Sequence, residues 1–465
     1  MPTAAPSAYS SGAWDEAFDP GGEIRPVARS ALESVGAHDL RALRALVHEE
    51  TRAAGMSFNA DGGRREFTVD PVPRVIDADE WAGLARGLEQ RVRALDAFVG
   101  DVHGPQRIIA DGVMPGRVLG GAEYYEPQLA GLRPPGRRWI GVAGFDVVRG
   151  DDGLFAVLED NLRTPSGIAF AVATRAALAA TLPEEVLAGV QPVDGAVALL
   201  GEALRAAVPA AATDPDDPHI VLLTDGAGNS AHWEHAWLAR ALGIPLARPD
   251  ELRARGDRIL LRELGRAVDV VYRRTDEDRG DSAVGRLLLP AMREGTLAVV
   301  NPFGTGVADD KLTQAYVEDM VRFYLGEEPL IRSVPTYDLA RALDLREALD
   351  RFGELVIKPR SGSGGRGVVI NPHAKPEDVE AVRRAVVSDP GAWVAQPMIC
   401  LSTHPTVIDG RLQPRHVDLR PFVLGTAGSP RMAPAALTRV AFDPGALVVN
   451  TSQNGGGKDT WVPAE

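Results

Sequence analysis

A lysine at the end of an apolar run, followed by a loop of serines and glycines, is the segment of this sequence best suited to hold a phosphate group. Lys358 follows an apolar run at 355–357 that predicts a buried strand, and the loop at 361–367 leads into a second apolar run. Glycine tolerates positive φ and lets backbone N–H groups approach a phosphate closely, while the lysine adds a positive charge at the same place. We expect a nucleoside triphosphate to be held between these two strands.

Three glycines of this loop, Gly362, Gly364 and Gly367, also match the G-x-G-x-x-G pattern of dinucleotide-binding loops. That pattern requires a helix directly after the loop, whereas here a strand-like run follows and helical periodicity begins only after Pro376. The sequence also lacks the G-x-x-x-x-G-K-[ST] pattern of P-loops. An ordinary hairpin turn stays open as the alternative interpretation.

A second group of candidate residues lies on a hairpin predicted near the front of the chain, with strands at 145–148 and 155–159 and a turn at 150–153. Side chains alternate along a strand, so Glu159 and Asn161 project to one face, and Asp146 on the partner strand could reach the same side. Two carboxylates and an amide oxygen are hard ligands of the kind that Mg²⁺ takes. The alternative is that these acidic residues merely end strands in solvent.

Composition limits the class of protein. A chain of 465 residues is too long for one small core, so we expect two or three packed units. The net charge of −14 argues against nucleic-acid binding, and no apolar run approaches the length of a membrane span. The N-terminus lacks the pattern of a signal peptide, and the single cysteine, Cys400, permits no intrachain disulfide, so a cytoplasmic location is expected. We expect Cys400 to be a small core residue.

Before the hairpin, the sequence predicts a loosely ordered start and two helices. Residues 1–30 are rich in Pro, Ser, Ala and Gly, which indicates a flexible lead-in. Apolar spacing predicts one amphipathic helix over 34–54 and a second over 81–98.

The middle of the chain alternates strand, loop and helix. Apolar runs at 219–223, 268–272 and 297–300 predict a layer of parallel strands. Ligands of such sheets bind beyond the carboxyl ends of the strands. Four residues at or just past those ends are therefore candidate substrate contacts: Thr224, Asn229, Arg273 and Arg274.

A later strand, predicted at 393–399, contains Pro397. A proline inside a strand implies an edge position or a hinge, where free backbone groups could contact an adenine.

Taken together, these segments resemble an ATP-grasp enzyme, specifically its circularly permuted branch, whose nearest named relatives are glutathionylspermidine-synthase-like proteins. In ordinary members, five motifs come before an Asp strand and a Glu-x-Asn strand. These five motifs are Asp-Lys, apolar-Lys-Pro with a Gly/Ser loop, a Gln-containing hinge strand, an Arg, and Asn with Gly-Gly. Here the last two motifs lie at the front of the chain, as a permuted chain would have them. The matching positions are Asp310-Lys311, Ile357-Lys358-Pro359, Gln396, Arg439, Asn450 with Gly455-Gly456, Asp146, and Glu159-Asp160-Asn161.

The resemblance implies an α/β (α+β) ATP-grasp fold, circularly permuted, with a Rossmann-like pre-ATP-grasp domain. It divides the chain into the lead-in at 1–30, a permuted ATP-grasp portion with the Mg-binding hairpin at 31–190, the Rossmann-like domain at 191–305, and the nucleotide-binding portion at 306–465.

The resemblance also implies individual roles, with ATP and Mg²⁺ as cofactors. Lys311 and Lys358 would hold the α- and β-phosphates, Arg439 would face the γ-phosphate, and Arg163 lies at a position near an acyl phosphate. Asp418 and Arg420 match a recurring Asp-x-Arg pattern without an assigned role. The other implied positions are Ser361, Ser363, Gly364 and Gly365 over the phosphates, Gln396, Pro397, Met398 and Ile399 along the adenine, Asp146, Glu159 and Asn161 around one or two Mg²⁺, and Asn450 at the substrate.

Such families activate a carboxylate. The carboxylate attacks the γ-phosphate to give an acyl phosphate and ADP, and an amine then displaces phosphate, which requires chiefly positioning and charge neutralisation. The resemblance therefore implies an ATP- and Mg-dependent carboxylate–amine ligase for small-molecule or peptide-like substrates; the sequence indicates no oligomeric state. An ATP-dependent phosphotransferase and a non-catalytic nucleotide-binding regulatory protein are the alternatives.

Overall fold

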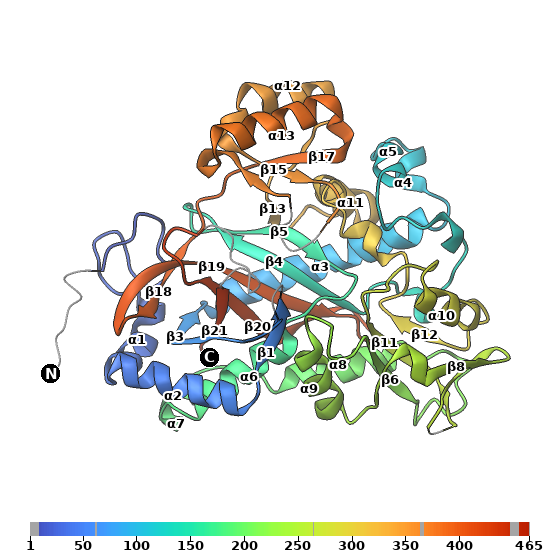
Figure 1. Cartoon of the computed structure of the whole chain (residues 1–465), viewed down its shortest axis with the longest axis horizontal. Helices are drawn as coiled ribbons and strands as arrows, with labels where there is room; N and C mark the ends of the chain where they lie inside the picture. Colours follow the sequence, from blue (N-terminus) through green and yellow to red (C-terminus); the bar gives the residue numbers. More distant parts are fainter. Residues whose placement is uncertain (1–8, 61–62, 264, 363–366, 447–454, 465) are drawn as a thin grey trace.

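One eight-stranded sheet forms the centre of the molecule (Figure 1). The structure is a computed structural model that describes residues 9–60, 63–263, 265–362, 367–446 and 455–464. In the sheet, β4 of the front hairpin pairs with β19 from the back of the chain, as the expected permutation requires. The strand order is β13-β5-β4-β19-β20-β21-β3, with β18 paired to β19. The bounds are β3 Val69–Val75, β4 Val142–Arg149, β5 Phe155–Asn161, β13 Arg332–Ser333, β18 Thr403–Ile408, β19 Arg411–Leu424, β20 Arg431–Ala441 and β21 Gly455–Trp461.

Different helices cover the two faces of this sheet. Along β20, Ala436 belongs to the same core as α3 (Ala78–Val102), whereas its neighbours Ala435 and Leu437 belong to the core that contains α6 (Ile168–Ala179). Successive side chains of a strand point to opposite faces, so α3 and α6 lie on opposite sides of the sheet. The helix predicted over 81–98 is confirmed as the central part of α3.

Two helices, α1 (Arg29–Gly36) and α2 (Leu40–Ala53), replace the single helix expected over 34–54. Asp39 precedes α2, and its side chain accepts a hydrogen bond from the Ala42 backbone N–H at 2.9 Å. This N-cap starts a new helix. The prediction was wrong because the apolar spacing continues across the cap.

The described part of the N-terminal lead-in is packed against the sheet, which corrects the expectation of a flexible segment. Asp15 forms a β-bridge with Thr403, and buried Glu16 forms an ion pair with Arg74 at 2.5 Å. Phe18 is buried in the core. These partners lie far away in the sequence, so the composition of the segment could not indicate them.

A separate sheet of parallel strands, order β12-β11-β6-β7, confirms the predicted α/β layer. A three-stranded antiparallel sheet, β10-β9-β8, lies between β7 and β11 in the sequence and was not anticipated. The bounds are β6 Ile220–Thr224, β7 Leu246–Ala247, β11 Val270–Arg274 and β12 Ala298–Val300, with β8 Leu252–Arg255, β9 Arg258–Leu261 and β10 Ala267–Val268; the helices of this region are α8 Gly195–Ala206, α9 His232–Leu242 and α10 Ala283–Arg293.

A small lobe stands above the central sheet in Figure 1 and has its own apolar core. Its antiparallel sheet has the order β14-β17-β15-β16. Of the two alternatives for the strand with Pro397, an edge position or a hinge, the edge position is excluded, because β17 lies between β14 and β15. Pro397 is the last residue of β17. The bounds are β14 Tyr337–Asp338, β15 Leu355–Pro359, β16 Val369–Ile370, β17 Trp393–Pro397, α12 Ala342–Asp350 and α13 Pro376–Ser388.

The remaining elements are short. None of the helices in the described ranges is long and apolar enough to cross a membrane. The remaining strands and α-helices are β1 Ser57–Ala60, β2 Gly63–Glu66, α4 Arg107–Ala110, α5 Arg117–Gly120, α7 Glu184–Leu187 and α11 Val317–Met320. Other helical turns are η1 Pro26–Ala28, η2 Pro127–Leu129, η3 Pro135–Arg137, η4 Pro249–Glu251, η5 Thr305–Ala308, η6 Thr313–Tyr316, η7 Val321–Leu325, η8 Phe352–Glu354, η9 Asn371–His373 and η10 Pro390–Ala392.

Candidate active site

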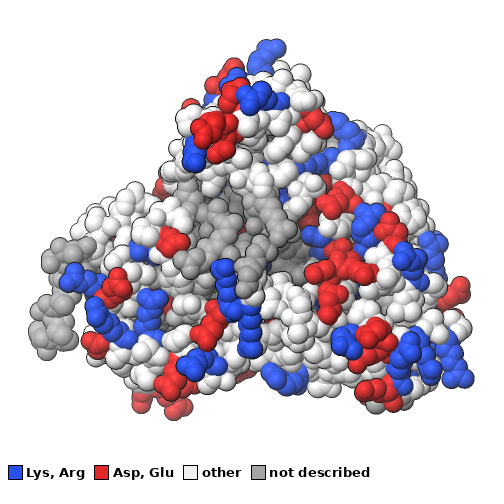
Figure 2. Space-filling model, in the orientation of Figure 1, with Lys and Arg blue, Asp and Glu red and all other residues white. Residues whose placement is uncertain are grey.

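A pocket of about 640 Å³ lies between the small lobe and the central sheet. Basic and acidic side chains are interspersed on the face of the molecule drawn in Figure 2. The pocket brings together most of the residues predicted from the sequence. Its lining includes Asp146, Glu159, Asn161, Arg163, Lys311, Lys358, Gln396, Pro397, Met398, Ile399 and Arg439.

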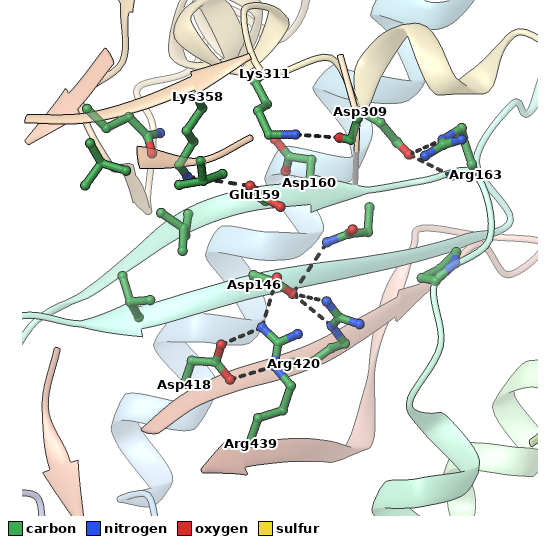
Figure 3. Close-up of a pocket in the computed structure, with 18 of the residues that line it drawn as sticks. Asp146, Glu159, Asp160, Arg163, Asp309, Lys311, Lys358, Asp418, Arg420 and Arg439 are labelled. Atoms are coloured by element: carbon green, nitrogen blue, oxygen red, sulfur yellow. Dashed lines mark hydrogen bonds and ion pairs between the residues drawn. The ribbon is translucent and has the colours of Figure 1, made fainter. Parts of the chain in front are cut away.

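Lys358, on β15, faces the front hairpin across the pocket (Figure 3). Its Nζ lies 3.5 Å from Glu159 Oε1. Burial lowers the pKa of Lys358, and nearby Lys311 lowers it further, while Glu159 opposes the change. Lys311 donates a hydrogen bond from Nζ to the Gly362 carbonyl at 2.8 Å. Two lysines from separate segments are thus placed in one pocket that Gly362, from the described start of the glycine loop, also lines.

Asp146, on β4, is held by two arginines (Figure 3). Arg420 donates to Asp146 Oδ1 from Nε at 2.8 Å and from Nη2 at 2.6 Å, and Arg439 Nη2 lies 2.9 Å from Asp146 Oδ2. Burial alone would raise the pKa of Asp146, but the two guanidinium charges lower it to about 2. Arg439 also binds Asp418, donating from Nε at 2.8 Å. Asp418 and Arg420, which had no assigned role, therefore fix the acidic and basic groups on the pocket floor.

Asp146, Glu159 and Asn161, the three predicted magnesium ligands, lie together on the β4–β5 hairpin and line the pocket. Asp146 pairs with Glu159 in the β4–β5 register, and Asn161 Nδ2 lies 3.5 Å from Asp146 Oδ1. Within the part of the chain that the structure describes, no group of three or more His, Cys, Asp or Glu residues could hold a metal ion. Magnesium usually takes only one or two carboxylates and completes its shell with phosphates and water. These residues therefore fit an ion shared with phosphates and do not fit a site built from protein ligands alone.

Apolar side chains form another part of the pocket lining, the apolar wall. Gln396 donates to Thr336 Oγ1 at 2.8 Å. Apolar pockets with a few fixed polar groups suit flat ligands such as a nucleobase. The residues of this wall are Val148, Leu158, Val356, Val368, Ile370, Pro397, Met398, Ile399 and Leu401.

Arg163 lies beyond the hairpin and is enclosed by groups that the sequence analysis did not identify. Its Nη1 donates to Asp278 at 2.8 Å, its Nε donates to Asp309 at 3.0 Å, and its guanidinium lies 3.9 Å from the Tyr124 ring centre. Burial raises the pKa of Asp309 to about 6 despite the charge of Arg163. Asp309 directly precedes Asp310-Lys311, so its proximity to that motif was the one signal available.

Among the described residues that line the pocket, none is one of the four predicted substrate contacts. Thr224 is buried with its hydroxyl 2.9 Å from His235 Nδ1, and Asn229 donates to Asp225 at 3.0 Å. Arg273, also buried, has only long contacts, donating to the Arg163 carbonyl at 3.5 Å. Their direct contact with substrate stays a prediction.

Arg274 supports the loop that follows β5. It donates to Ser166 Oγ at 2.5 Å and to Glu234 at 3.3 Å. Glu234 in turn accepts hydrogen bonds from the backbone N–H groups of Gly167 at 2.7 Å and Ala169 at 3.0 Å. The end of β11 therefore contacts this loop, and the loop, through Ser166, lines the pocket.

Some predicted positions lie away from the described lining. Ser361 is described but does not line the pocket, whereas Ser363, Gly364, Gly365 and Asn450 lie outside the described residues. Cys400 is exposed, which corrects its expected place in the core: it follows the end of β17, beyond the sheet that would have buried it.

A small antiparallel lobe with a lysine on one of its strands, set over a larger sheet with acidic residues on a hairpin, defines an ATP-grasp protein. The circularly permuted ATP-grasp type 2 family matches residues 73–441, and the chain belongs to this family.

Similar proteins occur in several bacteria. A protein of Frankia alni named "Putative glutamate--cysteine ligase 2-3" is 44% identical over 98% of this chain and 54% of its own length, so this chain spans about half of that relative. An uncharacterised protein of Synechocystis is 39% identical over 97% of this chain and 96% of its own length. A solved glutathione synthetase-like effector of Globodera pallida shares the fold, with a TM-score of 0.60, 11% identity, and coverage of 91% of this chain and 98% of its own.

Proposed function

We propose that this protein is an ATP- and Mg²⁺-dependent carboxylate–amine ligase that forms ADP and acts through an acyl phosphate. One observation carries the proposal: Lys311 and Lys358 share a single pocket with Glu159 and Asn161, although the two pairs come from opposite halves of the chain. Phosphate oxygens would replace Glu159 as the counter-charge of Lys358. Glu159 would then be available to a cation, which is the exchange that a metal–triphosphate complex requires.

Three cationic side chains of the pocket have defined tasks in this proposal. Lys311 and Lys358 would neutralise the phosphates, and Arg439, fixed by Asp146 and Asp418, would face the transferred phosphoryl group. Magnesium held by Glu159 and Asn161, with Asp146, would neutralise further phosphate charge. Groups that are already oriented need no rearrangement as charge develops, which favours the transition state.

The acyl phosphate would form next to Arg163. Arg163 lines the pocket and is held by Asp278 and Asp309, so its guanidinium is oriented before substrate binds. It could orient a substrate carboxylate or the acyl phosphate by charge-assisted hydrogen bonds. The Frankia relatives are named for glutamate and cysteine, so this is the first acid–amine pair to test.

The test is ADP formation with ATP, Mg²⁺ and paired pools of acids and amines. We expect ADP release that requires both an acid and an amine, and its loss when magnesium is chelated. ADP release with a hydroxyl acceptor and no amine would instead show a phosphotransferase. ATP binding without turnover in any pool would favour the regulatory alternative.

A further inference from the structure

Besides the Lys358–Glu159 pair, two ion pairs among the described residues join the small lobe to the rest of the molecule. In one, Arg360 Nε donates to both carboxylate oxygens of Asp310, at 2.8 and 3.0 Å. In the other, Arg117 donates to Asp338 at 2.8 Å from Nη1 and 2.5 Å from Nη2. The first pair is the more deeply buried: the side chains of Arg360 and Asp310 are 6% and 4% exposed, whereas Arg117 is 37% exposed.

Arg360 is also bound by backbone of the main body. Its Nη2 donates to the Val118 carbonyl, and its Nη1 donates to the Arg117 carbonyl at 3.4 Å. Both carbonyls belong to α5. Gly121, just after that helix, leaves room for the guanidinium, since a Cβ there would overlap Arg360 Nη1. Arg360, just after β15 of the small lobe, therefore projects into a polar site formed by Asp310 and the α5 carbonyls.

The Arg360–Asp310 ion pair is formed by residues that are close in sequence to the two lysines proposed to bind phosphate. Asp310 immediately precedes Lys311, and Arg360 follows Lys358 by two residues. Lys311 reaches the same loop through its hydrogen bond to the Gly362 carbonyl. The two lysines belong to different segments, so their separation depends on how those segments are joined.

Lysines of like charge repel each other, and a triphosphate is bound well only if both are held within reach of it. We propose that Arg360 is a positioning residue for nucleotide binding: by binding Asp310 and the α5 carbonyls, it fixes Lys358 of the small lobe relative to Lys311 of the body. The inference rests on the proposed nucleotide site, but it does not depend on which acid and amine are used.

The experiment compares Arg360→Met with Arg117→Met by calorimetric titration of ATP with Mg²⁺ and, separately, of adenosine. Both variants remove an ion pair that joins the same lobe to the body, but only Arg360 pairs with a residue adjacent to Lys311. Adenosine lacks the phosphates that the lysines contact, so its binding reports on the integrity of the apolar wall alone.

We expect Arg360→Met to weaken ATP binding about tenfold or more, because charge-assisted contacts to the phosphates are lost. Adenosine binding should be unchanged, and Arg117→Met should keep ATP affinity within about threefold of wild type. Equal weakening of ATP and adenosine binding, equal effects of the two variants, or unchanged ATP binding by Arg360→Met would each overturn the inference.

Two further measurements keep the test decisive. If Arg360→Met does not fold, Gly121→Ala is the substitute, because the added Cβ displaces the same guanidinium from the α5 carbonyls. It should weaken the binding of ATP but not of adenosine, and unchanged ATP binding would contradict the inference. The double variant Lys311→Met/Arg360→Met should lose less ATP-binding free energy than the sum of the two single variants, since residues that act through one another are coupled. Failure of the wild-type protein to bind ATP would overturn the nucleotide site itself, and with it this inference.

Discussion

Lys358 Nζ and Glu159 Oε1 lie 3.5 Å apart, which joins the small lobe to the front hairpin across the pocket. The lysine is 9% exposed and the glutamate 32% exposed, so the pair is largely shielded on one side and open to solvent on the other. In our proposal the lysine binds phosphate and the glutamate binds the metal ion. Their ion pair in the unliganded protein is the arrangement expected if a metal–triphosphate complex binds between the two side chains.

Glu159→Gln should abolish Mg²⁺-dependent ADP formation while the fold is kept. The amide keeps the shape of the carboxylate but loses the charge that holds a divalent cation. Because the ion pair with Lys358 is partly exposed, the free energy of unfolding should change by about 1 kcal/mol or less. ADP formation at the wild-type rate would refute the metal assignment. Asp152→Asn, at the turn of the same hairpin and outside the pocket, is the matched control and should keep full activity.

Lys358→Ala should weaken ATP binding by about 10- to 100-fold, since one charge-assisted contact to phosphate is lost. Lys375→Ala removes an exposed lysine from the same lobe and should leave the affinity unchanged. Calorimetric titration of ATP with Mg²⁺ into the three proteins measures this. Equal affinities for wild type and Lys358→Ala would show that the loop does not bind phosphate.

Asp146→Asn should destabilise the protein by on the order of 3 kcal/mol at pH 7, because two buried guanidinium groups lose their shared anion. The pKa of Asp146 is lowered from 3.8 to about 2 in the folded state. Its stabilising contribution is therefore complete above pH 3.8 and is lost as the pH falls through 2. The difference in the free energy of unfolding between wild type and variant should shrink below pH 4, as measured by urea unfolding at several pH values. A difference in the free energy of unfolding that stays constant down to pH 3 would contradict the stabilisation of the Asp146 carboxylate by Arg420 and Arg439.

Glu234→Gln should loosen the loop after β5. The side chain of Glu234 accepts hydrogen bonds from Gly167 and Ala169, and a neutral acceptor binds N–H groups less strongly than a carboxylate. Amide hydrogen exchange at Ala169 should therefore quicken more than exchange elsewhere in α6. Asp459→Asn breaks another buried ion pair of the same helix, with Arg175, and serves as the control. Similar exchange at Ala169 in both variants would argue that Glu234 has only a general stabilising role.

The sequence indicated the hairpin and its acidic residues because they depend on local rules. Glu159 and Asn161 alternate along one strand, and the turn between the strands has a recognisable composition. Lys358 was visible for the same reason, at the end of an apolar run. In contrast, the contacts of Asp146 with Arg420 and Arg439 depend on the pairing of β4 with β19 and of β19 with β20. No local sequence pattern specifies these pairings.

The four candidate substrate contacts predicted from strand ends do not line the described pocket, so their contact with substrate stays a prediction. Arg274 does lie at the carboxyl end of a parallel strand, but it is buried and its guanidinium donates to Tyr272, Ser166 and Glu234. The break between α1 and α2 was missed because the apolar spacing continues across Asp39, the N-cap of α2. The packing of the lead-in was missed because Glu16 pairs with Arg74, which is remote in the sequence.

The most direct test of the shared pocket is a crystal structure of the protein with a non-hydrolysable ATP analogue and Mg²⁺. We expect the phosphates to contact Lys311 and Lys358 and the metal ion to be bound by Glu159 and Asn161, with the adenine against the Gln396–Ile399 wall. An analogue bound elsewhere, or phosphates that contact the lysines while the metal ion is remote from the front hairpin, would contradict the proposal that these two parts of the chain act on one triphosphate.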